Sequence, residues 1–228
     1  MTDVQQPHSQ TLSRGLRVLE VLADSAEPMT IADLAATLGV HRSIAYRILR
    51  TLEDHGMISR NAAGAFALAP KMAALARGVE RSLQAAALPE LTTLANELTM
   101  TAFLVVLDHT QCVTLSSVEP RAGTATVAQR PGTRHSLALG APGIAIQSLL
   151  TDRELAERGV TRRPLDHGGF ATSHDEVIPG LRSVAVPLSA HGSPPAALAA
   201  VYVSSDRDAS EIATLLLTAS RSIGGRLG

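Results

Sequence analysis

Residues 30–55, TIADLAATLGVHRSIAYRILRTLEDH, predict a short helix, a tight turn and a second helix. Thr30 is a good N-cap, and Asp33 follows three residues later, where its carboxylate can complete a capping box. Gly39 supplies the left-handed residue that ends the first helix. We therefore expect a second helix to begin near His41, as in a helix-turn-helix.

Each of these two helices has one apolar face. Apolar residues recur there at helical spacing, and we expect them to pack inward: Ile31, Leu34, Ala35 and Leu38 in the first helix, and Ala45, Ile48, Leu49 and Leu52 in the second. The opposite face of the second helix carries Arg42, Ser43, Tyr46, Arg47 and Arg50. Residues 42–50 include no acid, so this face is locally positive.

A positive helix face after such a turn is typical of a helix that enters the DNA major groove. Arginine binds guanine O6 and N7 or a phosphate, and Ser43 and Tyr46 add hydrogen-bond donors. We assign base contacts to the residues nearest the helix N-terminus, which are Arg42, Ser43, Tyr46 and Arg47, and a backbone contact to Arg50. The alternative is a solvated face in an ordinary three-helix unit, and the clustering of these residue types favours DNA.

The flanking segments predict a winged helix. Residues 12–22 predict an amphipathic helix that covers the pair. Residues 56–60 are extended, 61–64 are turn-rich and 65–68 alternate again, which indicates a hairpin. Arg60 is placed to reach a phosphate or the minor groove, and a solvated strand end is the alternative interpretation of that residue.

Composition limits the class of protein. The 228 residues allow one large or two modest domains, and the net charge of -1 means that DNA affinity must come from local placement of charge. The lone Cys112 excludes an intramolecular disulfide and fits a reducing cytoplasm. With no leader-like start and no apolar run long enough to span a membrane, we expect a cytoplasmic protein with no membrane association.

The second half predicts an α+β domain. Residues 71–87 read as a helix that breaks at Pro89 and resumes over 90–98. Strands are expected at 103–107, 112–115, 124–128, 183–188 and 197–203, and helices at 141–150, 152–158 and 208–227, packed to one side of the sheet. The domains are then a disordered tail (1–10), a winged helix-turn-helix (11–69), a linker helix (70–87) and an effector-binding and dimerisation domain (88–228).

No catalytic set is evident, and we expect no enzyme, cofactor or metal. There is no G-x-S-x-G, no G-x-x-x-x-G-K loop and no paired-His zinc motif. His174, Asp175 and Glu176 contain metal-ligand types, but such a cluster is much more often a polar loop. His135 is one of several scattered histidines, which we expect to be solvated in loops. We expect Cys112 to be a small core residue.

The order of these features resembles the IclR family of bacterial transcriptional regulators. The likeness rests on RGLRVLEVLA (14–23), residues 30–58, GAFALAPKM (64–72) and GFATSHDEVIPGLRSVAVPL (169–188). It implies a winged helix-turn-helix joined by a linker helix to a C-terminal α+β (GAF-like) effector-binding domain. It also implies a homodimer or tetramer that binds double-stranded operator DNA, commonly as a repressor, with a small-molecule effector such as an organic acid.

In that family, a Gly/Ala-rich loop that enters a helix and a strand pair around Gly-Leu-Arg line the effector cavity. The matching positions here are Gly140, Ala141, Pro142, Gly143, Ser173, Leu181 and Ser183. Exposed amides at a helix start suit a carboxylate, although Pro142 lacks one, and a tight turn explains the two glycines equally well. Because Ile144 replaces the usual lysine and the following segment is short, a less polar effector, or none, remains open.

Three functional hypotheses follow. The leading one is a ligand-responsive transcription factor, either repressor or activator. The second is a small-metabolite enzyme whose winged helix docks a protein, and a steep salt dependence of DNA binding would argue against it. The third keeps DNA binding but makes the C-terminal domain a dimerisation device only, which thermal shifts with organic acids and amino acids would test.

Overall fold

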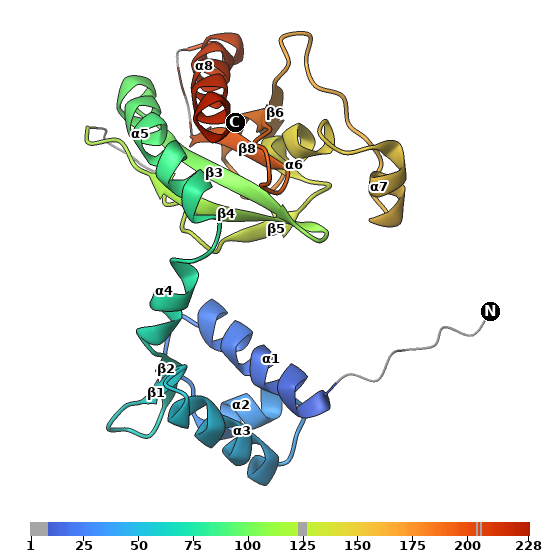
Figure 1. Cartoon of the computed structure of the whole chain (residues 1–228). Coiled ribbons are helices and arrows are strands. Elements are labelled where there is room, and N and C mark those ends of the chain that lie inside the picture. The colour runs from blue at the N-terminus through green and yellow to red at the C-terminus, as the bar shows by residue number, and fades with distance from the viewer. Residues whose placement is uncertain (1–8, 123–126, 204, 206) are drawn as a thin grey trace, which may run out of the picture. The chain divides into compact units, whose positions relative to one another are not determined.

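A computed structural model describes residues 9–122, 127–203, 205 and 207–228 (Figure 1). The chain divides into two compact units, with the boundary between Val79 and Glu80. Of the predicted tail, residues 1–8 lie outside the described residues, and residue 10 already belongs to the first helix, α1 (Gln10–Asp24).

The N-terminal unit is a winged helix-turn-helix. Helices α1, α2 (Ile31–Thr37) and α3 (Arg42–Asp54) precede an antiparallel hairpin of β1 (Ile58–Arg60) and β2 (Phe66–Leu68). Met29 makes a β-bridge to Phe66 and so ties the entry to α2 to the wing. One core joins all of these elements, and its buried members are Val18, Leu22, Leu34, Ile48, Leu49, Ile58 and Phe66. Short helix α4 (Lys71–Ala76) follows.

The turn between α2 and α3 forms as the sequence predicts. Asp33 N–H donates to Thr30 Oγ1 at 3.3 Å and Thr30 N–H donates to Asp33 Oδ2 at 3.0 Å, which completes the capping box. The hydrogen bonds from the Thr30 side chain and backbone hold the pKa of Asp33 below its ordinary value. Gly39 has φ +62°, and Val40 N–H donates to the Ala35 carbonyl at 3.0 Å. These bonds fix where α2 begins and ends.

The expected helix break at Pro89 is wrong. α4 ends at Ala76, Glu80 adopts a left-handed conformation with φ 44°, and α5 (Arg81–Leu98) then runs straight through Pro89. Proline costs a helix one hydrogen bond. Pro89 lies on the exposed side, however, and the other side of α5 is fully packed into the C-terminal unit through Leu83, Ala87, Leu91, Leu94, Ala95 and Leu98. Packing therefore outweighs the local helix-breaking signal, and α5 is part of that unit.

The C-terminal unit contains a six-stranded antiparallel sheet in the order β5-β4-β3-β8-β7-β6. Its strands are β3 (Thr101–Asp108), β4 (Gln111–Val118), β5 (Arg134–Ser136), β6 (Ala171–His174), β7 (Arg182–Leu188) and β8 (Ala196–Tyr202). Residues 124–126 of one expected strand lie outside the described residues, and 127–128 are not in a strand. Its helices after α5 are α6 (Gly140–Gln147), α7 (Asp152–Glu157) and α8 (Ala209–Leu227).

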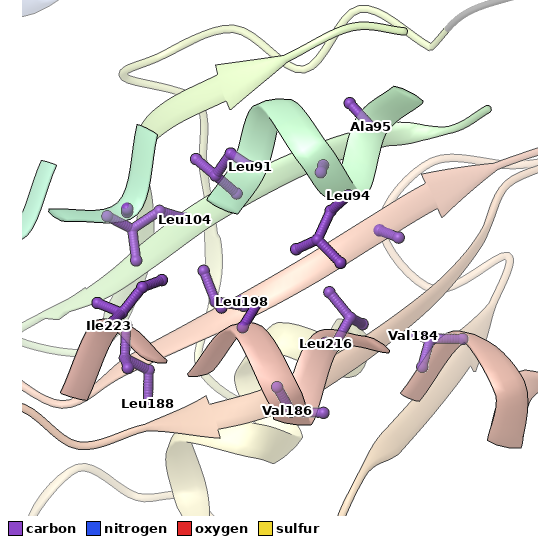
Figure 2. Packing of buried hydrophobic residues seen from close by; sticks show 14 of the residues in the cluster. Leu91, Leu94, Ala95, Leu104, Val184, Val186, Leu188, Leu198, Leu216 and Ile223 are labelled. Atoms are coloured by element: carbon purple, nitrogen blue, oxygen red, sulfur yellow. The ribbon is translucent and has the colours of Figure 1, made fainter. Parts of the chain in front are cut away.

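Helices cover both faces of this sheet, so the expectation that they pack to one side is wrong. Along β3, Leu104 and Val106 belong to the core under α5 and α8, whereas Phe103 and Val105 belong to the core under α6. Figure 2 shows the first of these cores, where Leu91 of α5 and Leu216 and Ile223 of α8 surround strand residues such as Leu198. The α+β class itself is confirmed.

Candidate nucleic-acid interface and ligand pocket

The predicted DNA-contacting residues of the second helix all lie exposed on α3. They are Arg42, Ser43, Tyr46, Arg47 and Arg50. The Tyr46 side chain, although aromatic, exposes 51% of its surface. The structure brings four of them together with the wing. A groove of about 890 Å³ is lined by Ile31, His41, Arg42, Ser43, Tyr46, Arg47, Arg60 and Phe66. Arg50 lies one turn beyond Arg47 and does not line this groove.

Arg60 is held in place within the wing. Its Nε donates to the Gly64 carbonyl at 3.2 Å, and its guanidinium carbon lies 5.5 Å from the centre of the Phe66 ring. Both contacts limit the rotamers of a side chain that an isolated strand end would leave free. The groove therefore has arginines on two elements, α3 and the wing.

His41, which sequence reasoning did not select, also lines this groove. It is the N-cap of α3: Ser43 N–H donates to its Nδ1 at 3.3 Å, and Ser43 Oγ lies 2.9 Å from the same nitrogen. Because Nδ1 accepts from a backbone N–H, it is the unprotonated nitrogen, and the Ser43 hydroxyl donates to it. In this arrangement the Ser43 oxygen can still accept a hydrogen bond in the groove, and its contact with DNA stays a prediction. Histidine is an uncommon N-cap, so this signal is hard to find in sequence.

A second pocket lies at the start of α6, where β6 and β7 meet it. Of the residues expected there, Pro142, Ser173, Leu181 and Ser183 line the pocket, whereas Gly140, Ala141 and Gly143 are buried beside it. The pocket encloses about 40 Å³, and its other walls are Phe103, Gln129, His135, Glu176, Val177, Ile178, Arg182 and Val201. Six helices and strands contribute to this lining: β3, β5, α6, β6, β7 and β8.

The backbone amides at the start of α6 are already used within the chain. Gly140 N–H donates to Glu176 Oε2 at 2.9 Å, Ala141 N–H donates to Ser173 Oγ at 3.0 Å, and Pro142 has no N–H. The expectation of exposed amides is therefore wrong for Gly140 and Ala141. Across the strand pair, Ser173 and Ser183 face each other with their hydroxyl oxygens 2.9 Å apart.

Glu176 also forms a bidentate ion pair with Arg163, with nitrogen–oxygen distances of 2.6 and 2.8 Å. The Arg163 hydrogen bonds, with a smaller effect from the Gly140 N–H, hold the pKa of Glu176 below its ordinary value. The carboxylate is thus ionised and fully engaged at the helix start.

The two helix-start glycines have structural roles. A Cβ on Gly143 would lie 2.6 Å from the Leu137 carbonyl oxygen, and one on Gly140, which has φ +75°, would lie 2.9 Å from Val177 Cγ2. Close packing therefore requires glycine at both positions, whatever binds in the pocket.

His135 is not the solvated loop residue that the sequence indicates. It lies on β5, and its Nε2 is buried with no hydrogen-bond partner among the described residues. Burial lowers the pKa of His135, so the imidazole is neutral at pH 7. Burial of a polar atom without a hydrogen-bond partner costs free energy, unless a ligand or a water molecule supplies that partner.

The remaining candidate groups have ordinary structural surroundings. His174 Nε2 lies 3.3 Å from Asp175 Oδ2, and within the described ranges no three His, Cys, Asp or Glu side chains are close enough to hold a metal ion. Cys112 is buried in the core under α6, where desolvation raises the pKa of its thiol to about 12. Nor does any helix in the described part of the chain have the length and apolar character to cross a membrane.

A winged helix-turn-helix with an arginine-lined groove, followed by an α+β unit, defines a DNA-binding transcriptional regulator. Residues 11–62 match the family model described as the IclR helix-turn-helix domain. Residues 11–62 therefore form an IclR-type helix-turn-helix domain, and the curated regulators and solved structures that resemble the chain support an IclR-type transcriptional regulator.

Two curated relatives are regulators of this kind. The chain is 31% identical over 119 residues to the HTH-type transcriptional regulator Rv1719 of Mycobacterium tuberculosis, a match that covers 52% of this chain and 46% of that protein, about half of its length. It is 28% identical over 210 residues to the HTH-type transcriptional regulator XynR of Escherichia coli, which covers 82% of this chain and 83% of XynR.

Solved structures share the fold over nearly the whole chain. An IclR transcriptional regulator from Alicyclobacillus acidocaldarius has a TM-score of 0.81 at 23% identity, covering 97% of this chain and 100% of that one. An IclR homologue from Microbacterium hydrocarbonoxydans, complexed with 4-hydroxybenzoate, has a TM-score of 0.80 at 20% identity, covering 96% and 99%. At these identities the likeness concerns the fold.

Proposed function

We propose that this regulator binds operator DNA through the groove between α3 and the wing, and that a small molecule in the α6 pocket modulates this binding. The observation that carries the proposal is the convergence of Arg42, Arg47 and Arg60 on one groove. Arg42, Ser43, Tyr46 and Arg47 read bases in the major groove. Arg50 and Arg60 contact the backbone or the minor groove.

The low net charge makes this groove the source of affinity. With a formal net charge of -1, the whole chain does not attract DNA, and binding depends on the few arginines that the two elements present. Each phosphate contact releases counterions, so affinity falls with salt with a log–log slope of about −0.9 per contact. Two copies of the groove on one dimer multiply this effect.

A homodimer, or a dimer of dimers, fits the exposed apolar side chains of the N-terminal unit. Leu12 and Leu16, one helical turn apart on α1, expose 63% and 52% of their surfaces, and Leu75 exposes 53%. A monomer in water gains nothing from such exposure, whereas a second copy would bury it. A two-fold dimer then reads a palindromic operator, and one that overlaps a promoter acts as a repressor.

For the C-terminal unit we propose effector binding without catalysis. The relative that is complexed with 4-hydroxybenzoate supports a small-molecule site in this fold. In the described part of the pocket, the Ser173 hydroxyl bonds to Ala141 N–H and to Ser183, and no histidine activates it. An effector acts only through different affinities for the DNA-competent and DNA-incompetent states. A role on DNA also implies a cytoplasmic location in a bacterium.

The test is recovery of bound duplexes from fragmented genomic DNA by the purified full chain. We expect a recurrent palindromic site, and genes beside it that indicate the pathway. An Arg42→Ala, Arg47→Ala variant should recover no enriched site. Equal enrichment by the variant, or none by the unmodified protein, would refute the assignment of the groove.

A further inference from the structure

The polar groups of the α6 pocket select the charge of its ligand. The start of a helix ordinarily favours an anion. Here that position holds the chain's own carboxylate, because Glu176 accepts from Gly140 N–H at 2.9 Å and pairs with Arg163. Ala141 N–H is bonded to Ser173, and Pro142 offers none. A ligand carboxylate would find no free amide at these three positions, and the nearby Arg163 guanidinium is already paired with Glu176.

Arg182 also lines the pocket, but it does not replace the occupied amides. It is exposed at the start of β7, and its charge acts on the Tyr202 phenol nearby. An ion pair with an exposed arginine is screened by water and salt and adds little affinity. An anion could therefore be held only weakly, at the mouth of the pocket.

The unsatisfied group in the pocket is His135 Nε2. It is buried without a partner among the described residues, and it lies 3.7 Å from the position of a Cβ on Gly140, next to the α6 start. A neutral imidazole nitrogen either donates or accepts, according to its tautomer. A hydroxyl and a primary amide can each donate and accept a hydrogen bond, so either group can bond to this nitrogen in both tautomers.

The pocket is small, and apart from Gln129, Ser173 and Ser183 its remaining walls are apolar. Phe103, Pro142, Leu181 and Val201 provide its walls, and the enclosed volume is about 40 Å³. That volume suits a ligand of a few heavy atoms. Val177 and Ile178 also line the pocket, and each exposes 43% of its surface. The walls thus match a short apolar body with one polar end.

We propose that the effector of this pocket is a small uncharged alcohol or amide whose polar group bonds to His135 Nε2, and that Glu176 excludes carboxylic acids from the helix start. This inference rests on the proposed effector function and specifies its ligand class. It replaces the organic acid that the family resemblance implies, because the helix start which would hold an acid is occupied from within the chain.

Propionamide and propionate test the proposal, because they have the same heavy-atom shape and differ in charge. The full chain, labelled with ¹⁵N, is titrated with each compound while the His135 Nε2 resonance is followed by NMR. The resonance is assigned by its loss in His135→Phe. We expect propionamide to shift it saturably and propionate to leave it in place. An equal or larger shift with propionate, or no shift with either compound, overturns the proposal.

A second test uses Glu176→Ala, which should bind propionate more tightly than the unmodified chain does. Removing the carboxylate frees Gly140 N–H and the Arg163 guanidinium, so propionate affinity should rise at least about tenfold. Glu157→Gln, a change to an exposed carboxylate on α7, is the matched control and should leave both titrations unchanged. If Glu176→Ala does not fold, the comparison of the two compounds on the unmodified chain still decides the question.

The ligand class and the proposed regulation can each be wrong without the other. Propionate binding refutes the ligand class and leaves an effector-responsive regulator intact. A chain that binds propionamide at His135 but retains the same operator affinity with and without it supports the pocket and refutes the proposed regulation. Gel shifts on the same preparation, with and without propionamide, distinguish these results.

Discussion

Replacing Glu176 with glutamine should destabilise the C-terminal unit by about 1–2 kcal/mol at neutral pH. Hydrogen bonds to charged groups contribute about 1.5–3 kcal/mol when shielded, whereas exposed ion pairs contribute about 0–1 kcal/mol. The Glu176 side chain is 23% exposed and that of Arg163 is 42% exposed, so the pair falls between these limits. Glutamine keeps the shape and one acceptor for Gly140 N–H but removes the charge.

The pH dependence identifies the charge as the cause. The pKa of Glu176 is lower in the folded chain than in the unfolded chain, mainly through its hydrogen bonds with Arg163. Its stabilisation is therefore complete above the unfolded-state pKa and is lost as the pH falls through the folded-state pKa. Arg163 stays charged throughout this range. The difference between the unmodified chain and Glu176→Gln should be largest near pH 7 and should shrink below about pH 4.

Tyrosine fluorescence measures this difference in one unit. The chain has no Trp and two Tyr: Tyr46 in the N-terminal unit and Tyr202 in the C-terminal unit. In a Tyr46→Phe background, urea unfolding followed through Tyr202 reports on the unit that contains Glu176, with Glu157→Gln as control. A Glu176→Gln difference that is the same at pH 7 and at acid pH would show that the charge of Glu176 does not stabilise the unit.

Three further predictions concern other parts of the molecule. Thr30→Ala removes the capping-box acceptor and should lower the unfolding free energy of the N-terminal unit by about 1 kcal/mol, measured through Tyr46; no change would contradict the role of the cap. Gly143→Ala places a Cβ 2.6 Å from a backbone carbonyl oxygen and should cost about 1–3 kcal/mol in urea unfolding, whereas Gly225→Ala on α8 meets nothing within 4 Å and should not destabilise. Leu16→Glu should shift sedimentation toward the monomer, and an unchanged dimer would place the interface elsewhere.

Local chemistry made much of the N-terminal unit predictable. The Thr30 and Asp33 pair, the left-handed Gly39 and the apolar spacing of α3 act within a few residues of one another, so sequence contains the whole signal. The continuous apolar runs in β3 and β8 likewise predict buried strands. Such runs are typical of strands that are covered on both faces, so they also contained a signal for the second layer of helices.

The ligand pocket was predictable only in part. The contact between Gly140 and Glu176 spans 36 residues, and nothing near either residue indicates it. The edge strands β5 and β6 are short and polar, so they lack the apolar alternation that reveals a strand, and His135 and Ser173 lie on them. Pro89 shows the converse: a strong local signal is outweighed by tertiary packing that the local sequence does not report.

In the function proposed above, a few arginines on α3 and the wing carry the affinity for DNA, and the salt dependence of binding is the sharpest test of their role. The operator recovered from genomic DNA is titrated at several salt concentrations with the full chain, with Arg47→Ala and with Arg153→Ala, which changes an exposed arginine on α7. We expect a linear log–log loss of affinity with salt, and Arg47→Ala weaker than the unmodified chain by about 1–3 kcal/mol at fixed salt, with Arg153→Ala unchanged. Affinity that is independent of salt, or equal for Arg47→Ala and the unmodified chain, would contradict the account.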